Sequence, residues 1–374
     1  MKYSLICLWM FASLFATTSV CAQDTVAATT PELEDTSMTA EEADHADELD
    51  EEHRAKLAFE GIRSGDLDMT KKYLFPQMVY DYDQDGENIL TLAIRSGNIE
   101  LINYVEQHAI INRKNKSGDT PLTLAIKEGN KEIVEIILYR AKASLKNDLG
   151  ELPISLALIH NYDLKLLQRL ITEGAKLDAR SNGVTPLSLA VKLDNLPAVA
   201  LFLKNGADAS YTNGDGTLPL TVAVLNNRQD IGGLLLNNSP SPTEDANWVN
   251  ELGEPLIVLA AAEGNNEMIQ TLVYFGANVD ATDYMDNTAL LVAAKNGDTI
   301  VMEFLVQNGA MVDAQNMMGI TPVMAAAESG QYAAASFLAN NGANIDGRSF
   351  SGIAATDFYS FTSPATAADP DNRP

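Results

Sequence analysis

Residues 118–134 read GDTPLTLAIKEGNKEIV, and this stretch decides the fold. Thr120 is a residue type whose hydroxyl can accept a hydrogen bond from an unpaired N–H at the start of a helix. Pro121 follows at the first helical position, where its missing N–H costs nothing. Gly129 suits the left-handed conformation that ends a helix, and apolar residues at helical spacing resume at Ile133. The stretch therefore predicts two short helices joined by a tight turn.

The same unit recurs along the chain. Glycines stand at near-constant spacing, with Asp286 in place of glycine once, and we call this aligned place the register position. Its glycines are Gly86, Gly118, Gly150, Gly183, Gly216, Gly253, Gly319 and Gly352. Successive intervals are 32, 32, 33, 33, 37, 33, 33 and 33 residues. Helix–turn–helix units of about 33 residues stack into solenoids, and the 37-residue interval indicates an insertion at 237–252.

On these motifs the chain resembles the ankyrin-repeat family, over roughly residues 54–360. The resemblance implies an all-α ankyrin-repeat solenoid of stacked helix–turn–helix units with β-hairpin fingers. We expect about nine units, with a degenerate first unit at Leu57–Phe75 and a final helix at Ala354–Phe361. The family's usual Thr-Pro-Leu-His-Leu-Ala lacks its histidine here. The replacing residues are Thr123, Ser155, Ser188, Thr221 and Val258.

Residues 1–22 are predicted to be a secretory signal peptide. An apolar run over residues 4–20 follows a positive start, and compact residues precede a cut after Ala22. An uncleaved anchor helix is the alternative, but the run is shorter than the roughly 20 residues that cross hydrocarbon. A lipoprotein cut at Cys21 lacks the small residue that such sites need before the cysteine. Both cysteines lie in this segment, so the exported chain has no disulfide, which favours a periplasmic location, with a secreted one as the alternative.

Acidic residues dominate the rest of the composition. Residues 23–53 are predicted to be an acidic disordered leader, because Asp24–Glu52 holds twelve acidic and no basic residues. The repeats occupy 54–361, and 362–374 is predicted to be a disordered tail. The formal net charge of the chain is −26, which disfavours nucleic acid and anionic lipid as partners. We expect a monomer with no nucleic-acid partner and no membrane insertion after signal cleavage.

Motifs for catalysis or metal binding are missing from the sequence. The four histidines lack ligand spacing, and no phosphate loop or serine-nucleophile elbow is present. Asp81–Gly86 begins like a calcium-binding loop, but Leu92 stands where the bidentate glutamate belongs. We therefore expect neither enzyme activity nor a cofactor or metal.

Large apolar residues mark the C-terminal finger tips, which are predicted to lie two residues before the register position. The last three tips and their neighbours are Tyr284, Met285, Met317, Met318 and Phe350. Aromatic residues and methionine are enriched in the cores of protein interfaces, although these side chains could instead pack onto their own hairpins. Trp248, in the insertion, is a further candidate, because tryptophan is frequent among binding hot spots.

The sequence therefore predicts an exported protein–protein interaction module. It would bind a folded protein partner through the concave surface formed by fingers and first helices. In one alternative, the acidic leader acts as a cation-binding or solubilising segment on an inert repeat stack. In another, the protein is a secreted effector that engages a host protein.

Overall fold

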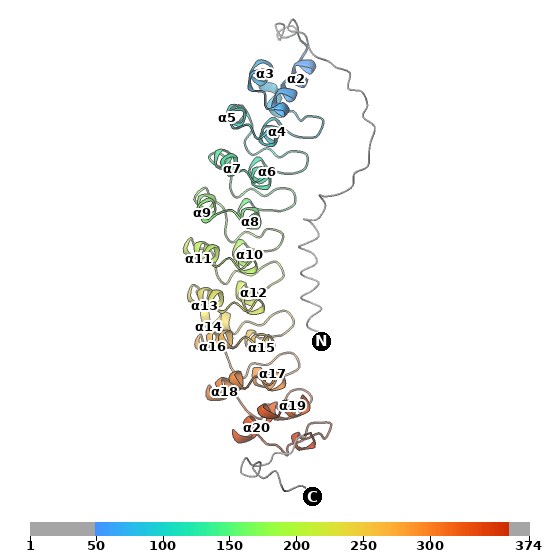
Figure 1. Cartoon of the computed structure of the whole chain (residues 1–374), viewed down its shortest axis with the longest axis vertical. Helices are drawn as coiled ribbons and strands as arrows, with labels where there is room; N and C mark the ends of the chain where they lie inside the picture. Colours follow the sequence, from blue (N-terminus) through green and yellow to red (C-terminus); the bar gives the residue numbers. More distant parts are fainter. Residues whose placement is uncertain (1–48, 359–374) are drawn as a thin grey trace, which may run out of the picture. The chain divides into compact units, whose positions relative to one another are not determined.

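The computed structural model describes residues 49–358 of the 374-residue chain. The predicted signal peptide (1–22), the predicted leader up to residue 48 and the predicted tail (362–374) lie outside the described residues. Within residues 49–358 the chain forms successive pairs of short helices, and Figure 1 shows these pairs one after another, with a loop protruding between consecutive pairs. The expected all-α repeat fold is confirmed for this part of the chain.

The helices fall into two series. The first helices of the pairs are α4 (Ile89–Ser96), α6 (Pro121–Glu128), α8 (Pro153–Ile159), α10 (Pro186–Lys192), α12 (Pro219–Leu225), α15 (Leu256–Ala262), α17 (Ala289–Asn296) and α19 (Pro322–Glu328). The second helices are α5 (Ile99–His108), α7 (Lys131–Leu138), α9 (Leu164–Thr172), α11 (Leu196–Lys204), α13 (Gln229–Asn237), α16 (Asn266–Tyr274), α18 (Thr299–Gln307) and α20 (Tyr332–Asn340). The remaining elements are α2 (Glu51–Ser64), α3 (Leu67–Tyr73), η2 (Pro76–Tyr80), α14 (Pro242–Ala246) and η3 (Ala355–Asp357).

The core runs along the stack between neighbouring pairs. Each first helix from α4 to α17 packs against the first helix of the next pair, and most second helices do the same. In α6, Leu122 and Leu124 are buried, and the small side chain of Ala125 lets the helices approach closely. Since each unit buries its apolar residues against its neighbours, the units stabilise one another in sequence.

Helix caps fall where the recurring residues predict them, with one exception. The Thr120 hydroxyl accepts from the Thr123 N–H at 3.1 Å, and α6 ends at Gly129 with φ 81°. The Thr185 hydroxyl likewise accepts from the Ser188 N–H at 3.0 Å. Thr321, at the same place before α19, makes no such bond, and its hydroxyl oxygen is buried without a partner.

The fingers are closed loops more than β-hairpins. Among residues 49–358 their β pairing is limited to isolated bridges, such as Thr282 with Thr288. Side chains close the loops instead: Oδ1 of Asn115 accepts from the N–H of Asp119 at 2.9 Å. Every register glycine has positive φ, and Asp286 adopts the same conformation with φ 61°. The register position is therefore confirmed, but the expected hairpin ladder is not formed, because the side-chain hydrogen bonds and the left-handed residue close the loop within a few residues.

The two ends differ from the expected boundaries. Helix α2 begins at Glu51 and is capped by the side chain of Asp50, so residues 51–53 belong to its first turn and not to the leader. Carboxylates in the first turn of a helix favour its N-terminal dipole, which composition alone cannot reveal. Of the expected final helix at 354–361, the structure describes residues up to 358, and these form a single 3-10 turn, η3. The Asp357 carboxylate closes this turn by accepting from the Ala354 N–H at 2.8 Å.

The insertion at 237–252 contains a short extra helix, α14, which packs against α13. Asp245 of this helix is buried and accepts a hydrogen bond from the Ser210 hydroxyl at 2.6 Å. The insertion is therefore an integrated part of the stack.

Candidate functional site

The last three finger tips expose their side chains. The exposed fraction is 53% for Tyr284, 56% for Met317 and 77% for Phe350. Met318 is 49% exposed, whereas Met285 is half-buried. The structure leaves these tips exposed, and their role in binding a partner stays a prediction. We call Tyr284, Met317 and Phe350 the finger row.

Backbone hydrogen bonds hold the three fingers side by side. The Met317 N–H donates to the Met285 carbonyl at 2.9 Å, and the Phe350 N–H donates to the Met318 carbonyl at 3.1 Å. These hydrogen bonds pair backbone N–H and C=O groups of neighbouring fingers with one another. The exposed side chains at the tips take no part in them and can contact a partner. The last three fingers are therefore joined through their backbones, with an exposed apolar side chain at the tip of each.

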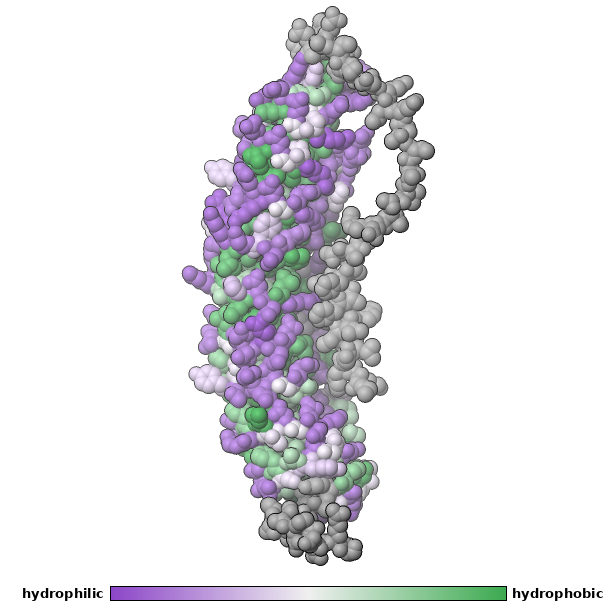
Figure 2. All heavy atoms as spheres, in the orientation of Figure 1, coloured by the Kyte–Doolittle hydropathy of each residue, from purple (hydrophilic) through white to green (hydrophobic). Residues whose placement is uncertain are grey.

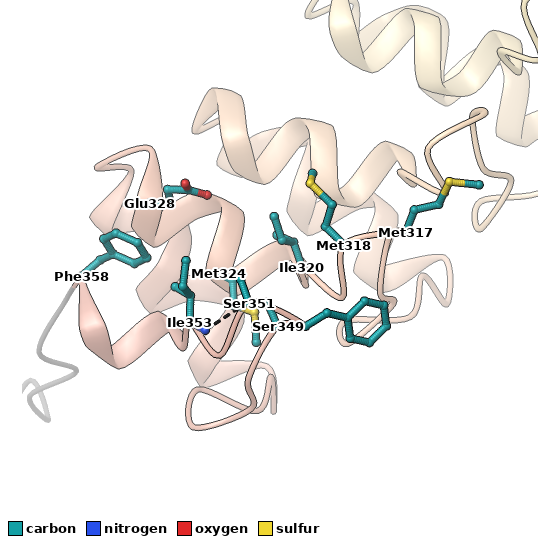
Figure 3. Close-up of a pocket in the computed structure, with 10 residues that line it drawn as sticks. Met317, Met318, Ile320, Met324, Glu328, Ser349, Ser351, Ile353 and Phe358 are labelled. Carbon is teal, nitrogen blue, oxygen red and sulfur yellow. Dashed lines mark hydrogen bonds between the residues drawn. The ribbon is translucent and has the colours of Figure 1, made fainter.

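A hollow of about 530 Å³ opens beside the last two fingers (Figure 3). Its lining residues are Met317, Met318, Ile320, Met324, Glu328, Ser349, Phe350, Ser351, Ile353 and Phe358. Met324, in α19, is buried at its floor, and the Ile353 N–H donates to the Ser349 hydroxyl at 3.1 Å, the bond drawn in Figure 3. In Figure 2, hydrophobic residues are most numerous over the middle repeats, a smaller group of them lies at the finger side of the last repeats, and the first repeats are mostly hydrophilic. The hollow is thus an apolar surface with few polar groups.

Two residues that line the hollow are not among the candidates from the sequence, although the repeat alignment distinguishes them. Ile320 and Ile353 directly follow the register position, where Glu87, Asp119 and Glu151 stand in the first repeats. A change from acid to isoleucine at one repeat position marks the same C-terminal surface as the finger row. Phe358, which also lines the hollow, has no equivalent in the other repeats and gave no such signal.

Trp248 lies outside the hollow. Its side chain is half-buried, and its indole N–H is buried without a hydrogen-bond partner. The structure thus brings Met317, Met318 and Phe350 together at the hollow and joins Tyr284 and Met285 to them through the fingers. A role for Trp248 in binding stays a prediction.

The first repeats carry ion pairs where the last repeats carry apolar residues. Arg95 pairs with Glu87 and Glu128, both at 2.8 Å. Lys127 pairs with Asp119 at 2.8 Å and with Glu151 at 3.0 Å. Partial burial acts to lower the pKa of Lys127, but its hydrogen bonds to the two carboxylates outweigh this effect and raise the pKa above its usual value. These charges are satisfied within the protein and leave few groups for a ligand.

In the loop Asp81–Gly86, which begins like a calcium-binding loop, an arginine forms ion pairs with two of the carboxylates. The Arg63 guanidinium lies 2.7 Å from an Asp83 oxygen and 2.6 Å from an Asp85 oxygen. Across residues 49–358, no three histidine, cysteine or acidic side chains are grouped so that they could hold a metal ion. In the same range, no helix is both long and apolar enough to cross a membrane.

Stacked helix pairs with protruding fingers define a helical repeat protein. The chain belongs to the ankyrin-repeat family: the model described as "Ankyrin repeats (3 copies)" matches residues 58–147, 154–246 and 256–349. Ankyrin repeats generally mediate protein–protein interaction and are typically non-enzymatic binding modules.

Individual relatives share only part of their length with this chain. A fowlpox virus protein named as an ankyrin repeat protein, FPV031, is 34% identical over 126 residues, which are 33% of this chain and 37% of that protein. The Homo sapiens transient receptor potential cation channel subfamily A member 1 is 30% identical over 95 residues, 25% of this chain and 8% of the channel. Mus musculus neurogenic locus notch homolog protein 1 is 34% identical over 127 residues, 33% of this chain and 5% of that protein. The similarity therefore spans well under half of each relative.

Among solved structures, the chain is similar to the ankyrin repeat domain of Bcl-3, a member of the IkappaB protein family. The TM-score is 0.50 at 28% sequence identity, covering 56% of this chain and 94% of that domain.

Proposed function

We propose that this chain is an exported protein that binds a folded protein partner through the finger row and the hollow beside it. The observation that carries the proposal is the exposure of three large apolar side chains at equivalent places in three successive repeats. Burying one such side chain is worth about 1.5–3 kcal/mol, and a contiguous apolar surface of this kind marks an interaction site. The protein acts as a monomer, without nucleic acid, membrane insertion or catalysis.

Capture of the partner tests the binding proposal. The full chain carrying Phe350→Ala or Tyr284→Ala should retain the partner with an affinity lower by about 2 kcal/mol or more. Tyr274→Ala is the matched control, because Tyr274 is 84% exposed but belongs to the second-helix series. Equal loss in all three variants, or no loss in the finger variants, would contradict the proposal. Thermal unfolding of each variant separates lost binding from lost structure.

Export is a separate part of the proposal and rests on the predicted signal peptide. The protein isolated from its own cell envelope or medium should begin at Gln23. A protein that begins at Met1, or that carries lipid on Cys21, would contradict a soluble exported form.

The acidic leader offers the second candidate function, because Asp24–Glu52 combines twelve acids with no base. Deleting residues 23–48 leaves α2 and its Asp50 cap intact. Partner capture should then be unchanged if the fingers bind, whereas loss of function with capture intact would favour the leader. The effector hypothesis is a variant of the first proposal, in which the captured partner comes from a host.

A further inference from the structure

The repeats that carry the finger row and the hollow have an acidic composition. Residues 276–358 contain nine acidic and two basic residues, a net charge of −7. The acidic residues are Asp280, Asp283, Asp286, Asp298, Glu303, Asp313, Glu328, Asp346 and Asp357. Of the two bases, Arg348 is engaged within the protein, with its guanidinium 2.5 Å from the Gly352 carbonyl oxygen and 3.5 Å from the Asp357 carboxylate. Lys295 is exposed in the last turn of α17.

Glu328 stands out among these acids, because it lines the hollow itself. Its side chain is exposed, and Figure 3 draws no hydrogen bond between its carboxylate and the other residues of the hollow. The same place, nine residues after the register position, holds a base in four other repeats. Those bases are Arg95, Lys127, Lys192 and Lys295. At this repeat position a negative charge, Glu328, therefore replaces the positive charge of those four repeats, and it does so where the side chain lines the apolar hollow.

We infer that the hollow takes a polypeptide segment that carries lysine or arginine beside apolar anchor residues. This inference rests on the proposed function and specifies its partner. The apolar side chains of Met317, Met318, Ile320 and Phe350 receive the anchors, and a hollow of about 530 Å³ lies in the size range of pockets that enclose ligand groups. Glu328, together with the net negative charge of residues 276–358, attracts the basic side chains, because complementary charge steers association and selects among partners.

Charge also argues against two other occupants. A second copy of this chain would bring a formal net charge of −26 towards an acidic surface. The segment that follows Phe358 carries Asp369 and Asp371 against Arg373, so it offers no excess of basic residues. A basic segment of another protein is the occupant that the charges favour.

Two synthetic peptides test the inference with the full chain. One is an amphipathic helical peptide of leucine and lysine, and the other replaces each lysine by glutamate. Fluorescence anisotropy should show the lysine peptide binding roughly tenfold more tightly or better, with the difference shrinking as salt screens the charges. Equal binding of the two peptides would overturn the inference.

Variants must show that the peptide occupies the hollow and does not simply coat an acidic protein. Phe350→Ala and Glu328→Gln should each weaken binding of the lysine peptide several-fold, and Glu328→Lys should remove the preference for lysine. Glu267→Gln is the matched control, since Glu267 is an exposed acid on α16. Binding of the lysine peptide that none of the hollow variants changes would overturn the inference.

The remaining outcomes separate the inference from the proposed function. Phe350→Ala could abolish capture of the native partner while the protein binds the lysine and glutamate peptides equally. That result would support the proposed binding function and contradict the inference that the partner is basic. If a chain ending at Phe358 binds both peptides far more tightly, the native occupant is the chain's own terminal segment, and the inference falls. A dimer in light scattering that Phe350→Ala dissociates would identify a second copy as the occupant and also overturn it.

Discussion

Gly319 lies directly against Phe350. A β-carbon at position 319 would stand 2.8 Å from Cδ1 of the Phe350 ring and 2.9 Å from its backbone nitrogen. Gly319 is the register residue of one finger, and Phe350 is the tip of the next. The missing side chain thus lets the last finger approach its neighbour, and the exposed phenylalanine is held over the backbone of the finger before it.

This contact predicts a specific effect of Gly319→Ala. The residue has φ 70°, so alanine would be strained by about 1 kcal/mol, and its methyl group would also displace Phe350. Gly352→Ala is the matched control, because Gly352 has φ 83° and nothing within 4 Å of an added β-carbon. Both variants should lose stability in thermal unfolding, Gly319→Ala the more because the Phe350 backbone must also shift, but only Gly319→Ala should weaken partner binding. Equal binding by the two variants would mean that the position of Phe350 does not matter.

The repeat architecture was predictable because one backbone requirement recurs. A left-handed residue must stand at the register position, and glycine meets this requirement at the lowest cost. Asp286 shows that the requirement belongs to the position, since it adopts φ 61° without being glycine. The finger row followed from the same alignment, because residues at equivalent places in stacked units lie next to one another.

Other features depend on contacts that the repeat pattern does not encode. Helix α14 arises within the only irregular interval and is held by the contact of Asp245 with Ser210, from the preceding finger. The start of α2 depends on the Asp50 cap, which the acidic composition around it concealed. Ile320, Ile353 and Phe358 all line the hollow. Phe358 has no equivalent residue in the other repeats, so the repeat alignment could not predict its contribution.

Local stability should follow the order of the units. Leu124, in α6, is 2% exposed, so Leu124→Ala should cost about 2–5 kcal/mol. Hydrogen exchange should accelerate in α4, α6 and α8 before it does in α17–α20, because each unit contacts only its neighbours. Leu149→Ala, at an exposed finger position, should have little effect. Uniform acceleration along the chain would contradict a quasi-linear stack.

The cap positions predict unequal effects of one substitution. Thr120→Val removes the hydroxyl that accepts from the Thr123 N–H and should cost about 1 kcal/mol. Thr321→Val removes a buried hydroxyl oxygen that has no partner, so stability should be unchanged or slightly higher. Chemical denaturation measures the unfolding free energy of the two variants, whose substitutions lie at equivalent places in two repeats. A similar loss in both would show that Thr321 also caps its helix in solution.

Alkaline pH should weaken the stack through Tyr162. Burial raises the pKa of its phenol, which donates a hydrogen bond to the Ile126 carbonyl at 3.2 Å. A raised pKa means that the folded chain favours the protonated form. The contribution to stability is therefore complete below the unfolded-state pKa of about 10 and is lost as the pH rises through the folded-state value.

Tyr162→Phe isolates this contribution. The difference in unfolding free energy between the original chain and the variant should be constant below about pH 9 and should shift in favour of the variant above about pH 10. A pH-independent difference for Tyr162→Phe would mean that its phenol titrates alike in the folded and unfolded chains.

Trp248 reports whether the insertion takes part in binding. Its indole N–H is buried without a partner, and its carbonyl accepts from the Leu256 N–H at 3.2 Å, which fastens it to the start of α15. The residue does not line the hollow. In a chain with Trp9→Phe, Trp248 is the sole tryptophan, so its emission reports this one place. Partner bound only at the finger row and the hollow should leave the wavelength and intensity of that emission unchanged. A shift on binding that persists in Tyr274→Ala but vanishes in Phe350→Ala would extend the interface from the last fingers to the insertion.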